Sequence, residues 1–338
     1  MVINLANLNL QPPVFLAPMA GITDTPSRDI AQLFRPGLVV SEMIASSEKD
    51  RDYFEKKVKA NLFSKRKNIK VSPTAIQIAG HEISWMTYAA KVIENEGGDL
   101  IDINMGCPAK KIVGRLAGSA LMKEPTHALK MIEAIVKSTN LPVTLKMRLG
   151  WDTNSINAPI IAARAENLGV QMITVHARTR SQFFKGKPNW VAVKNVKSSV
   201  KIPVIVNGDI IDSNSAGKAV RQSKANGIMI GRGAIGKPWL INEIAKSFYA
   251  EIDNKNEISI SMDELITLHL EKIINFYGAE IGIRIFRKHL VNYMRGVEIN
   301  SQSYRTLITE GSIKKLEKRL KGVFKQEKVK VFHDRFCY

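Results

Sequence analysis

The chain alternates short apolar runs with longer amphipathic segments. Eight apolar runs end in glycine, asparagine, proline or charged residues, and they begin at Val14, Leu38, Thr74, Leu100, Pro142, Met172, Pro203 and Gly227. Between them, segments such as 81–97 and 126–139 carry apolar residues three and four positions apart, which predicts helices. Strand and helix alternating eight times predict an α/β fold of the (β/α)8 TIM barrel type.

A doubly wound sheet is the rival architecture, because residues 231–236 read GRGAIG and match the dinucleotide fingerprint GxGxxG. That fingerprint belongs in the first strand-helix-strand unit, whereas here it follows the last apolar run. In a barrel, the same glycines let backbone amides approach a phosphate beside strands seven and eight. The barrel is therefore the favoured prediction.

The region after the barrel is predicted to be helical. A (β/α)8 barrel occupies roughly 250 residues, so we assign residues 1–245 to it and 246–338 to a small C-terminal helical domain with a basic tail. Ile283, Phe286, Leu290 and Tyr293 recur at helical spacing, and the pattern repeats over 313–324. The final run, 325–338, carries no clear pattern.

The charge is strongly positive and concentrated near the C-terminus. The 338 residues include 50 Lys and Arg against 31 Asp and Glu, a net charge of +19. Residues 284–338 hold 14 basic and 5 acidic residues. A basic surface of this kind is expected to bind a nucleic-acid backbone, although a generally lysine-rich composition is the alternative explanation. The candidate contacts on the first tail helix are Arg284, Arg287, Lys288 and Arg295.

Composition also limits the compartment and the chemistry. The two cysteines, Cys107 and Cys337, have no spacing that suggests a disulfide framework or a zinc site. No apolar stretch is long enough for a membrane span, and the N-terminus does not resemble an export signal. We expect a cytoplasmic protein without a metal site, without contact to a membrane and without an obligate protein partner, and we expect it to be a monomer.

Polar residues gather where the predicted strands end, which is where such barrels place their active sites. Cys107 follows a strand directly and precedes the pair Lys110 and Lys111, which favours a reactive thiol at a bound ligand over core packing. The other strand-end residues are Pro18, Met19, Ala20, Gln77, Asn104, Lys146, Arg148, His176, Arg178, Asn207, Gly208, Asp209, Gly231 and Arg232.

The strand-end set excludes several common reactions. It has no close carboxylate pair for glycoside hydrolysis, no GxSxG elbow, and no cluster of metal ligands. It offers amides and a lysine suited to a flat heterocycle with partial negative charge, together with an anion-binding end. Flavin mononucleotide (FMN) fits this description, with its phosphate near the last two strands and Lys146 near the ring.

Eight segments in order carry a family resemblance. They are LAPMAGITDTPSR from Leu16, QIAGHE from Gln77, DINMGCPAKK from Asp102, GSALM from Gly118, LKMRLGWD from Leu145, TVHARTRSQFFKG from Thr174, NGDI from Asn207 and MIGRGAIGKPW from Met229. On these motifs the chain resembles the tRNA-dihydrouridine synthases, and most closely their bacterial B-type branch. The resemblance implies an FMN-binding barrel, a helical domain that holds tRNA, and NADPH or NADH as the reductant.

The resemblance also implies residue roles. Cys107 matches the proton donor, Asn104 lies where the target uracil is read, and Arg178 and Arg148 are substrate contacts, as are Lys110 and Lys111 at the RNA. The matching flavin contacts are Pro18, Met19, Ala20, Gln77, Lys146 and His176 around the ring, and Asn207, Gly208, Asp209, Gly231 and Arg232 near the ribityl chain and phosphate.

The implied reaction reduces the C5–C6 double bond of specific D-loop uridines in tRNA. It needs a hydride at C6, which reduced FMN supplies, and a proton at C5, for which a thiol with an ordinary pKa of about 8.5 is a suitable acid. Two alternatives stay open: a flavin barrel that reduces a free small molecule of the dihydroorotate or enone type, and a non-catalytic RNA-binding barrel.

Overall fold

The computed structural model describes residues 2–45, 51–62, 72–249, 257–295, 297–324 and 328–332. Within this part of the chain, eight parallel strands close into a barrel, which confirms the predicted fold. All eight predicted runs contain a barrel strand: β3 (Val14–Leu16), β4 (Leu38–Val40), β6 (Thr74–Ala79), β7 (Leu100–Met105), β8 (Val143–Arg148), β9 (Met172–His176), β10 (Val204–Asn207) and β11 (Gly227–Ile230).

The barrel closes between its first and last strands. Ile228 of β11 lies opposite Val14 of β3, and β4 pairs with the start of β6. A short strand, β5 (Ile44–Ala45), pairs with the carboxyl end of β6. The second barrel strand is therefore divided into β4 and β5, with residues 41–43 between them.

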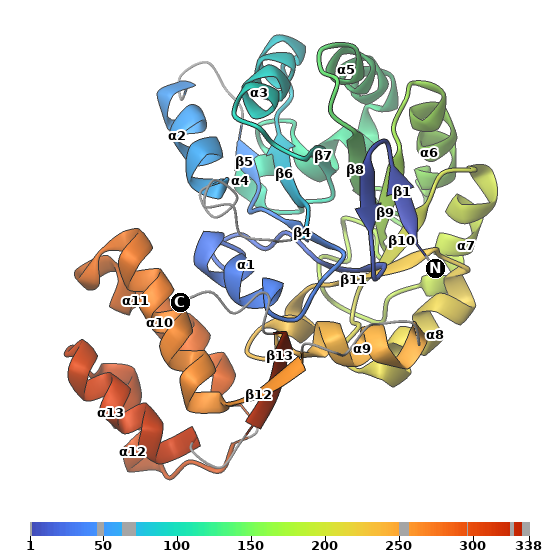
Figure 1. The fold of residues 1–338 in the computed structure, drawn as a ribbon. Coiled ribbons are helices and arrows are strands. Elements are labelled where there is room, and N and C mark those ends of the chain that lie inside the picture. Colours follow the sequence, from blue (N-terminus) through green and yellow to red (C-terminus); the bar gives the residue numbers. More distant parts are fainter. Residues whose placement is uncertain are drawn as a thin grey trace.

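Helices surround the barrel, as Figure 1 shows. The two helices that the sequence predicted in detail are present as α3 (Ile83–Asn95) and α5 (Pro125–Lys137). The other helical segments of the barrel are α1 (Thr25–Gln32), α2 (Arg51–Asn61), α4 (Lys110–Val113), the 3-10 helix η3 (Gly118–Lys123), α6 (Ala158–Asn167), α7 (Trp190–Ser199), α8 (Ser213–Ser223), η4 (Arg232–Ala234) and α9 (Leu240–Phe248).

The side chains inside the barrel form an apolar layer with a polar layer above it. Phe15, Leu100, Met172, Ile205 and Met229 are buried in one cluster, together with residues of an N-terminal hairpin. The hairpin consists of β1 (Ile3–Leu5) and β2 (Leu8–Leu10), paired antiparallel, and it packs on this layer. Because alternate residues of a strand share a face, the next inward positions toward the carboxyl ends include the polar residues Gln77, Asp102, Thr174 and Asn207, whereas β3 and β4 continue with Ala17 and Val40.

The C-terminal region is helical, as predicted, and packs on one side of the barrel (Figure 1). It contains α10 (Met262–Tyr277), α11 (Ala279–Tyr293), α12 (Ser301–Thr309) and α13 (Ile313–Phe324). α10 begins with a capping box, in which Ser261 and Glu264 bond each other's backbone amides. Strand β12 (Glu257–Ser261) pairs antiparallel with β13 (Lys328–Phe332), so part of the unpatterned final run forms a strand.

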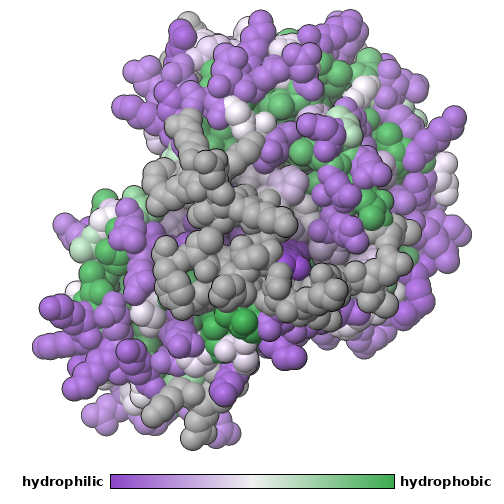
Figure 2. Space-filling model, in the orientation of Figure 1, coloured by the Kyte–Doolittle hydropathy of each residue, from purple (hydrophilic) through white to green (hydrophobic). Residues whose placement is uncertain are grey.

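The tail helices show the predicted two-sided character. On α11, Phe286 and Leu290 are fully buried, whereas Arg284 and Lys288 are exposed. On α13, Leu316 and Leu320 are buried, and the exposed basic residues are Lys314, Lys315, Lys318, Arg319 and Lys321. Hydrophilic side chains dominate much of this side of the molecule in Figure 2.

A polar cluster joins the C-terminal helices to the barrel. Ser27 Oγ of α1 lies 3.2 Å from His269 Nε2 and 3.4 Å from His289 Nε2. Tyr277 donates its hydroxyl hydrogen to Asp24 Oδ2 over 3.1 Å. A cavity of about 40 Å³ lies beside these groups, between the barrel and α10 and α11. This volume suits ordered water and is far too small for a nucleotide cofactor.

Candidate active site at the strand ends

The carboxyl ends of neighbouring strands bring the predicted polar residues together. The register places Asn104 opposite Lys146, Arg148 opposite His176, and His176 opposite Asn207. Residues opposite each other in a sheet share a face, so these side chains all belong to the polar layer inside the barrel. Gln77, Asn104, Lys146 and Asn207 are each less than one tenth exposed.

Lys146 is a buried ammonium held by an amide. Its Nζ donates to Asn207 Oδ1 over 3.2 Å, and Asn207 in turn donates its amide to the carbonyl of Met229 over 2.8 Å. Burial lowers the pKa of Lys146 to about 8, although the nearby Asp102 carboxylate opposes this shift. Lys146 is therefore still mostly charged at neutral pH.

His176 is a neutral group in a cationic setting. Burial, and then the positive charges of Lys146, Arg148, Arg178 and Arg232, hold the pKa of His176 well below its usual value. Its Nε2 lies 3.4 Å from Arg178 Nη1. An uncharged imidazole at this position can donate one hydrogen bond and accept another without adding to the positive charge.

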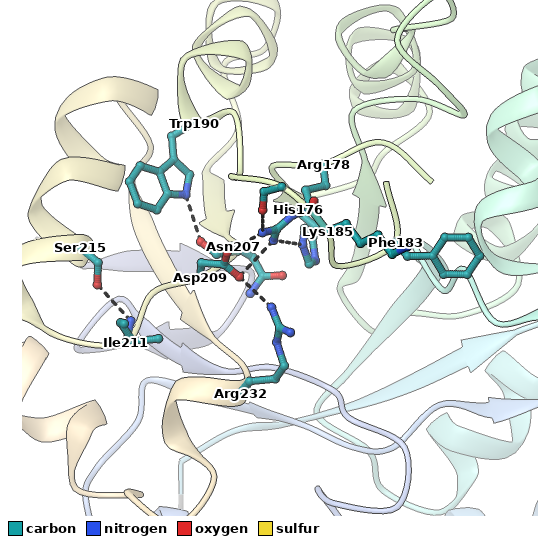
Figure 3. Close-up of polar contacts among 12 residues, drawn as sticks. His176, Arg178, Phe183, Lys185, Trp190, Asn207, Asp209, Ile211, Ser215 and Arg232 are labelled. Atoms are coloured by element: carbon teal, nitrogen blue, oxygen red, sulfur yellow. Dashed lines mark hydrogen bonds and ion pairs between the residues drawn. The ribbon is translucent and has the colours of Figure 1, made fainter. Parts of the chain in front are cut away.

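Asp209 connects two arginines beside the last strands (Figure 3). Arg178 donates to Asp209 Oδ1 over 3.0 Å and also bonds Oδ2, while Arg232 donates to Oδ1 over 2.7 Å. Asp209 has a φ of +49° and follows Gly208 at +123°. The turn is further held by Trp190, whose indole donates to the carbonyl of Gly208 over 3.0 Å. Arg232 keeps more than half of its side chain exposed, so it can also meet an anion.

Cys107 lies in a turn that is tied down through its backbone. Asn104 Oδ1 accepts from the amides of Gly106 and Cys107 over 3.1 and 3.0 Å, and Ser119 donates its hydroxyl to the carbonyl of Cys107 over 2.8 Å. The Cys107 side chain is half-buried. Lys110 and Lys111 are exposed on α4, directly after this turn.

Arg148 and Arg178 are fully buried, although both were predicted as substrate contacts. Arg148 donates to the carbonyls of Gly106, Thr179 and Phe183, each within 2.7 to 2.8 Å. Arg178 donates to the carbonyls of Lys185 and Gly186. In this conformation the two guanidinium groups support the loop at 179–186 from beneath, and Arg148 links that loop to the Cys107 turn.

Pro18, Met19 and Ala20 form the loop after β3, where the sequence placed them. Met19 donates its amide to Thr23 Oγ1 over 2.8 Å, and a Cβ at Gly231 would lie 3.8 Å from Met19 Sδ. The first and last strand-end loops therefore touch. A Cβ at Gly21 would lie 3.7 Å from Lys288 Nζ, so a cation from α11 reaches this loop.

The other predicted tRNA contacts on α11 and just after it have different surroundings from Lys288. Arg284 pairs with Glu280 at 2.7 Å on the exposed face of α11. Arg287 donates to the carbonyl of Glu310 over 3.4 Å, and Arg295 is exposed at the end of α11. Of the four predicted tail contacts, Lys288 is thus the one beside the strand-end loops.

Phe184 was missed by the sequence analysis. Its ring is half exposed, and the guanidinium carbons of Arg232 and Arg148 lie 4.9 and 5.6 Å from the ring centre. The His176 ring lies 6.2 Å away. An exposed aromatic ring among cations is suited to stacking on a nucleobase. The available signal was the pair Phe183–Phe184 in a loop that is otherwise polar, but this loop lies several residues beyond the end of β9 and not at the strand end itself.

The donor set fits a flat, carbonyl-rich heterocycle. Lys146 has three ammonium hydrogens, and among the described residues its hydrogen-bond acceptor is Asn207 Oδ1. Gln77 and Asn104 each use one amide hydrogen in bonds to the chain, which leaves a second hydrogen on each nitrogen. The described residues contain no cluster of three or more metal-ligating side chains, and none of their helices is long and apolar enough to cross a membrane.

The closed parallel barrel with a polar strand-end layer defines a (β/α)8 enzyme. Its fold is similar to that of a morphinone reductase mutant in complex with tetrahydroNAD, with a TM-score of 0.54 and 14% identity over 71% of this chain and 88% of that one. It is also similar to a 2-naphthoyl-CoA reductase complex, with a TM-score of 0.55 and 14% identity over 72% of this chain and 51% of that one.

The family described as dihydrouridine synthase (Dus) matches residues 15–329, and the chain therefore belongs to it. A "Probable tRNA-dihydrouridine synthase" of Rhodobacter capsulatus is 49% identical over 86% of this chain and 88% of its own. The "tRNA-dihydrouridine synthase B" of Pasteurella multocida is 39% identical over 88% of each. The resemblance seen in the motifs is thus confirmed, and the family consists of flavin-dependent oxidoreductases that act on uridines of tRNA.

Proposed function

We propose that this protein reduces uridines in the D-loop of tRNA to dihydrouridine, with FMN as its flavin and NADPH or NADH as the reductant. The observation that carries the proposal is the Cys107 turn beside the buried layer of Gln77, Asn104 and Lys146. This arrangement places an acid next to donors for a flat ring. The alternative of a free small-molecule substrate leaves the exposed basic residues of α11 and α13 without a role.

The FMN would be held by the residues that line the mouth of the barrel, which is its opening at the carboxyl ends of the strands. Lys146, Gln77 and His176 would face its ring, together with the loop of Pro18, Met19 and Ala20. Asn207, Gly208, Asp209, Gly231 and Arg232 would hold the ribityl chain and phosphate, with Arg232 dividing its bonds between Asp209 and the phosphate. When bound and reduced, the flavin supplies the hydride for C6 of uracil.

Cys107 would protonate C5 of the uracil. The turn fixes the Cys107 backbone through both its amide and its carbonyl, so the thiol is presented from a defined position. Lys110 and Lys111 point into solvent on α4, where they are free to meet RNA phosphates. Asn104, which bonds the same turn, would read the edge of the uracil with its remaining amide hydrogen.

The target nucleotide would have to leave its stack to reach the barrel mouth. Phe184 is positioned to stack on the extruded base, and Arg148 and Arg178 would support that loop and approach the substrate if the loop moved. We assign residues 1–245 to the catalytic barrel and 246–338 to tRNA binding, with Arg284, Arg287, Lys288 and Arg295 on the contact surface. The enzyme would act as a monomer in the cytoplasm, where its substrate is found.

The test is a comparison of wild type with Cys107→Ala, using purified protein and tRNA that lacks dihydrouridine. Mass spectrometry of the tRNA measures the product, and absorbance at the flavin band measures reduction by NADPH. We expect Cys107→Ala to reduce its flavin at the normal rate and to slow transfer to tRNA by about 100-fold or more, as for loss of a general acid. A colourless wild-type protein, or tRNA without dihydrouridine after turnover, would refute the proposal.

A further inference from the structure

A continuous chain of hydrogen bonds runs from a buried carboxylate to the Cys107 turn. Gln77 Nε2 donates to Asp102 Oδ2 over 2.7 Å, and Asn104 Nδ2 donates to Gln77 Oε1 over 2.7 Å. Asn104 Oδ1 then accepts from the amide of Cys107 over 3.0 Å. We propose that Asp102 is a positioning residue, which acts through Gln77 and Asn104 to hold Cys107 in its reactive place.

The hydrogen bonds of this relay all run in one donor-to-acceptor direction, which the groups at its two ends determine. A carboxylate oxygen can accept a hydrogen bond from Gln77, so the carbamoyl NH₂ of Gln77 must face Asp102 and its oxygen must face Asn104. At the other end the backbone amides of Gly106 and Cys107 can only donate, so Asn104 must present its oxygen to them. Both ends demand the same orientation of the two amides, so every hydrogen bond along the relay joins a donor to an acceptor.

Asp102 is itself held rigidly and carries no direct role at the mouth. It is 3% exposed, and Thr144 donates its hydroxyl to Oδ1 over 2.7 Å, so both oxygens are engaged. Burial raises the pKa of the Asp102 carboxyl, and the bonds from Gln77 and Thr144 and the charge of Lys146 oppose that shift. The ionised carboxyl accepts at both oxygens, and a neutral carboxyl still accepts from Gln77 at Oδ2 when its proton lies on Oδ1.

The strand geometry explains why the relay can reach the turn. Gln77 and Asp102 lie opposite each other on β6 and β7, and Asn104 is two residues beyond Asp102 on the same face. Asn104 is also two and three residues before Gly106 and Cys107, which is the spacing at which an asparagine oxygen reaches following backbone amides. One buried carboxylate thus fixes amides on two strands and, through them, the turn.

The kinetic consequence of this positioning role rests on the proposed function. Replacing Asp102 with alanine leaves the Gln77 amide without its acceptor and frees both amides to rotate. A displacement of the thiol by about 1 Å can slow a reaction by about 100-fold. We therefore expect Asp102→Ala to slow the transfer from reduced enzyme to tRNA by about 10- to 100-fold, with KM for tRNA little changed.

Asp102→Asn is the conservative variant, since its amide oxygen can still accept from Gln77, and we expect it to restore most of the rate. Asp99→Ala is the control: Asp99 immediately precedes β7, at the end away from the site, and its half-buried carboxylate accepts from the amide of Thr74 over 3.0 Å. It reports the cost of losing a carboxylate contact between β6 and β7 without touching the relay, and it should leave the rate of transfer unchanged.

Two measurements separate positioning from general damage. In a double-mutant cycle, Asp102→Ala combined with Asn104→Ala should be no slower than Asn104→Ala alone, because both act on one path. In a Cys337→Ser background, the maximal rate at which iodoacetamide alkylates Cys107 at high pH should rise several-fold in Asp102→Ala and stay at the wild-type value in Asp102→Asn and Asp99→Ala. The alkylation assay needs no turnover, so it tests the relay even if tRNA is not the substrate.

Additive losses in the cycle, or an unchanged alkylation maximum in Asp102→Ala, would overturn the proposal. Equal losses in Asp102→Ala and Asp99→Ala would do the same, since they would indicate a general loss of stability. By contrast, a wild-type enzyme that is alkylated normally but forms no dihydrouridine would refute the proposed function and leave the relay standing.

Discussion

At Gly236 the backbone of the barrel lies close against the backbone of α11. Gly236 follows η4 at the end of the last strand-end loop, with a φ of +72°. A Cβ at this position would lie 2.4 Å from both the carbonyl carbon and the oxygen of Asn292 on α11. Neither backbone atom can rotate away, so Gly236→Ala should force α11 and the barrel apart.

The loss of folding stability expected in Gly236→Ala has two parts. An alanine in the left-handed region is less stable by about 1–2 kcal/mol, and overpacking a tight contact adds about 1–3 kcal/mol. We therefore expect Gly236→Ala to lower the free energy of unfolding by about 2–5 kcal/mol. At about 2 °C for each kcal/mol in a large domain, the melting temperature should fall by about 4–10 °C.

Gly278→Ala provides the matched control. Gly278 lies between α10 and α11 with a φ of +78°, but a Cβ there would meet no atom within 4 Å. It should lose only the conformational part, about 1–3 kcal/mol, because a backbone at φ +78° and ψ 164° is adopted readily by glycine alone. The assays are thermal unfolding of both variants and the ratio of tRNA reduction to NADPH oxidation, which should fall in Gly236→Ala alone because α11 carries Lys288 to the mouth. Equal losses of stability in the two variants would refute the steric argument.

Three further predictions concern the mouth and the tail. The rate of flavin reduction by NADPH, a step that does not use Cys107, should fall above pH 8 as Lys146 loses its proton, and a pH–rate profile of Lys146→Arg should lack this limb. Unfolding is not the cause, because a lysine whose pKa is lowered to about 8 makes the folded state more stable as pH rises from there toward 10.5. Phe184→Ala should weaken tRNA binding in a filter assay by about 1–3 kcal/mol, the usual contribution of a base stacked on an aromatic ring, whereas Phe184→Tyr should not. Lys318→Gln on α13 should reduce the slope of log affinity against log salt by about 0.9 if the residue neutralises one phosphate, and Lys130→Gln on α5, across the molecule in Figure 1, should leave the slope unchanged.

The eight barrel strands could be predicted because parallel strands are buried on both faces. Leu100–Met105 and Val143–Arg148 are buried at every position, so their apolar character is interrupted only by the inward polar residues. The division of the second strand into β4 and β5 could not be predicted, since it depends on how the chain pairs with β6. The pairing of β12 with β13 joins residues about 70 positions apart, and neither run is distinctive by itself.

The site residues show a similar limit. Their positions at the strand ends follow from the order of elements, and the structure brings Gln77, Asn104, Lys146, His176 and Asn207 into one layer. The burial of Arg148 and Arg178 could not be predicted, because their acceptors are the carbonyls of Gly106 and of the loop at 179–186 and the carboxylate of Asp209, up to 42 residues away along the chain. It also offered no reason to single out Asp102, whose importance depends on the amides around it.

The balance of charge in the mouth explains why so much of the site is devoted to orientation. Lys146, Arg148, Arg178 and Arg232 converge there, and burial together with their positive charges holds the pKa of His176 well below its usual value. Burial lowers the pKa of Arg148 to about 10, yet it stays cationic at neutral pH. Concentrated positive charge attracts an anionic cofactor and substrate from any direction. It therefore raises their affinity but does not fix the orientation in which they bind. Geometry must come from fixed hydrogen bonds, and two carboxylates supply it: Asp209 orients Arg178 and Arg232, and the buried Asp102 orients the amides that lead to Cys107.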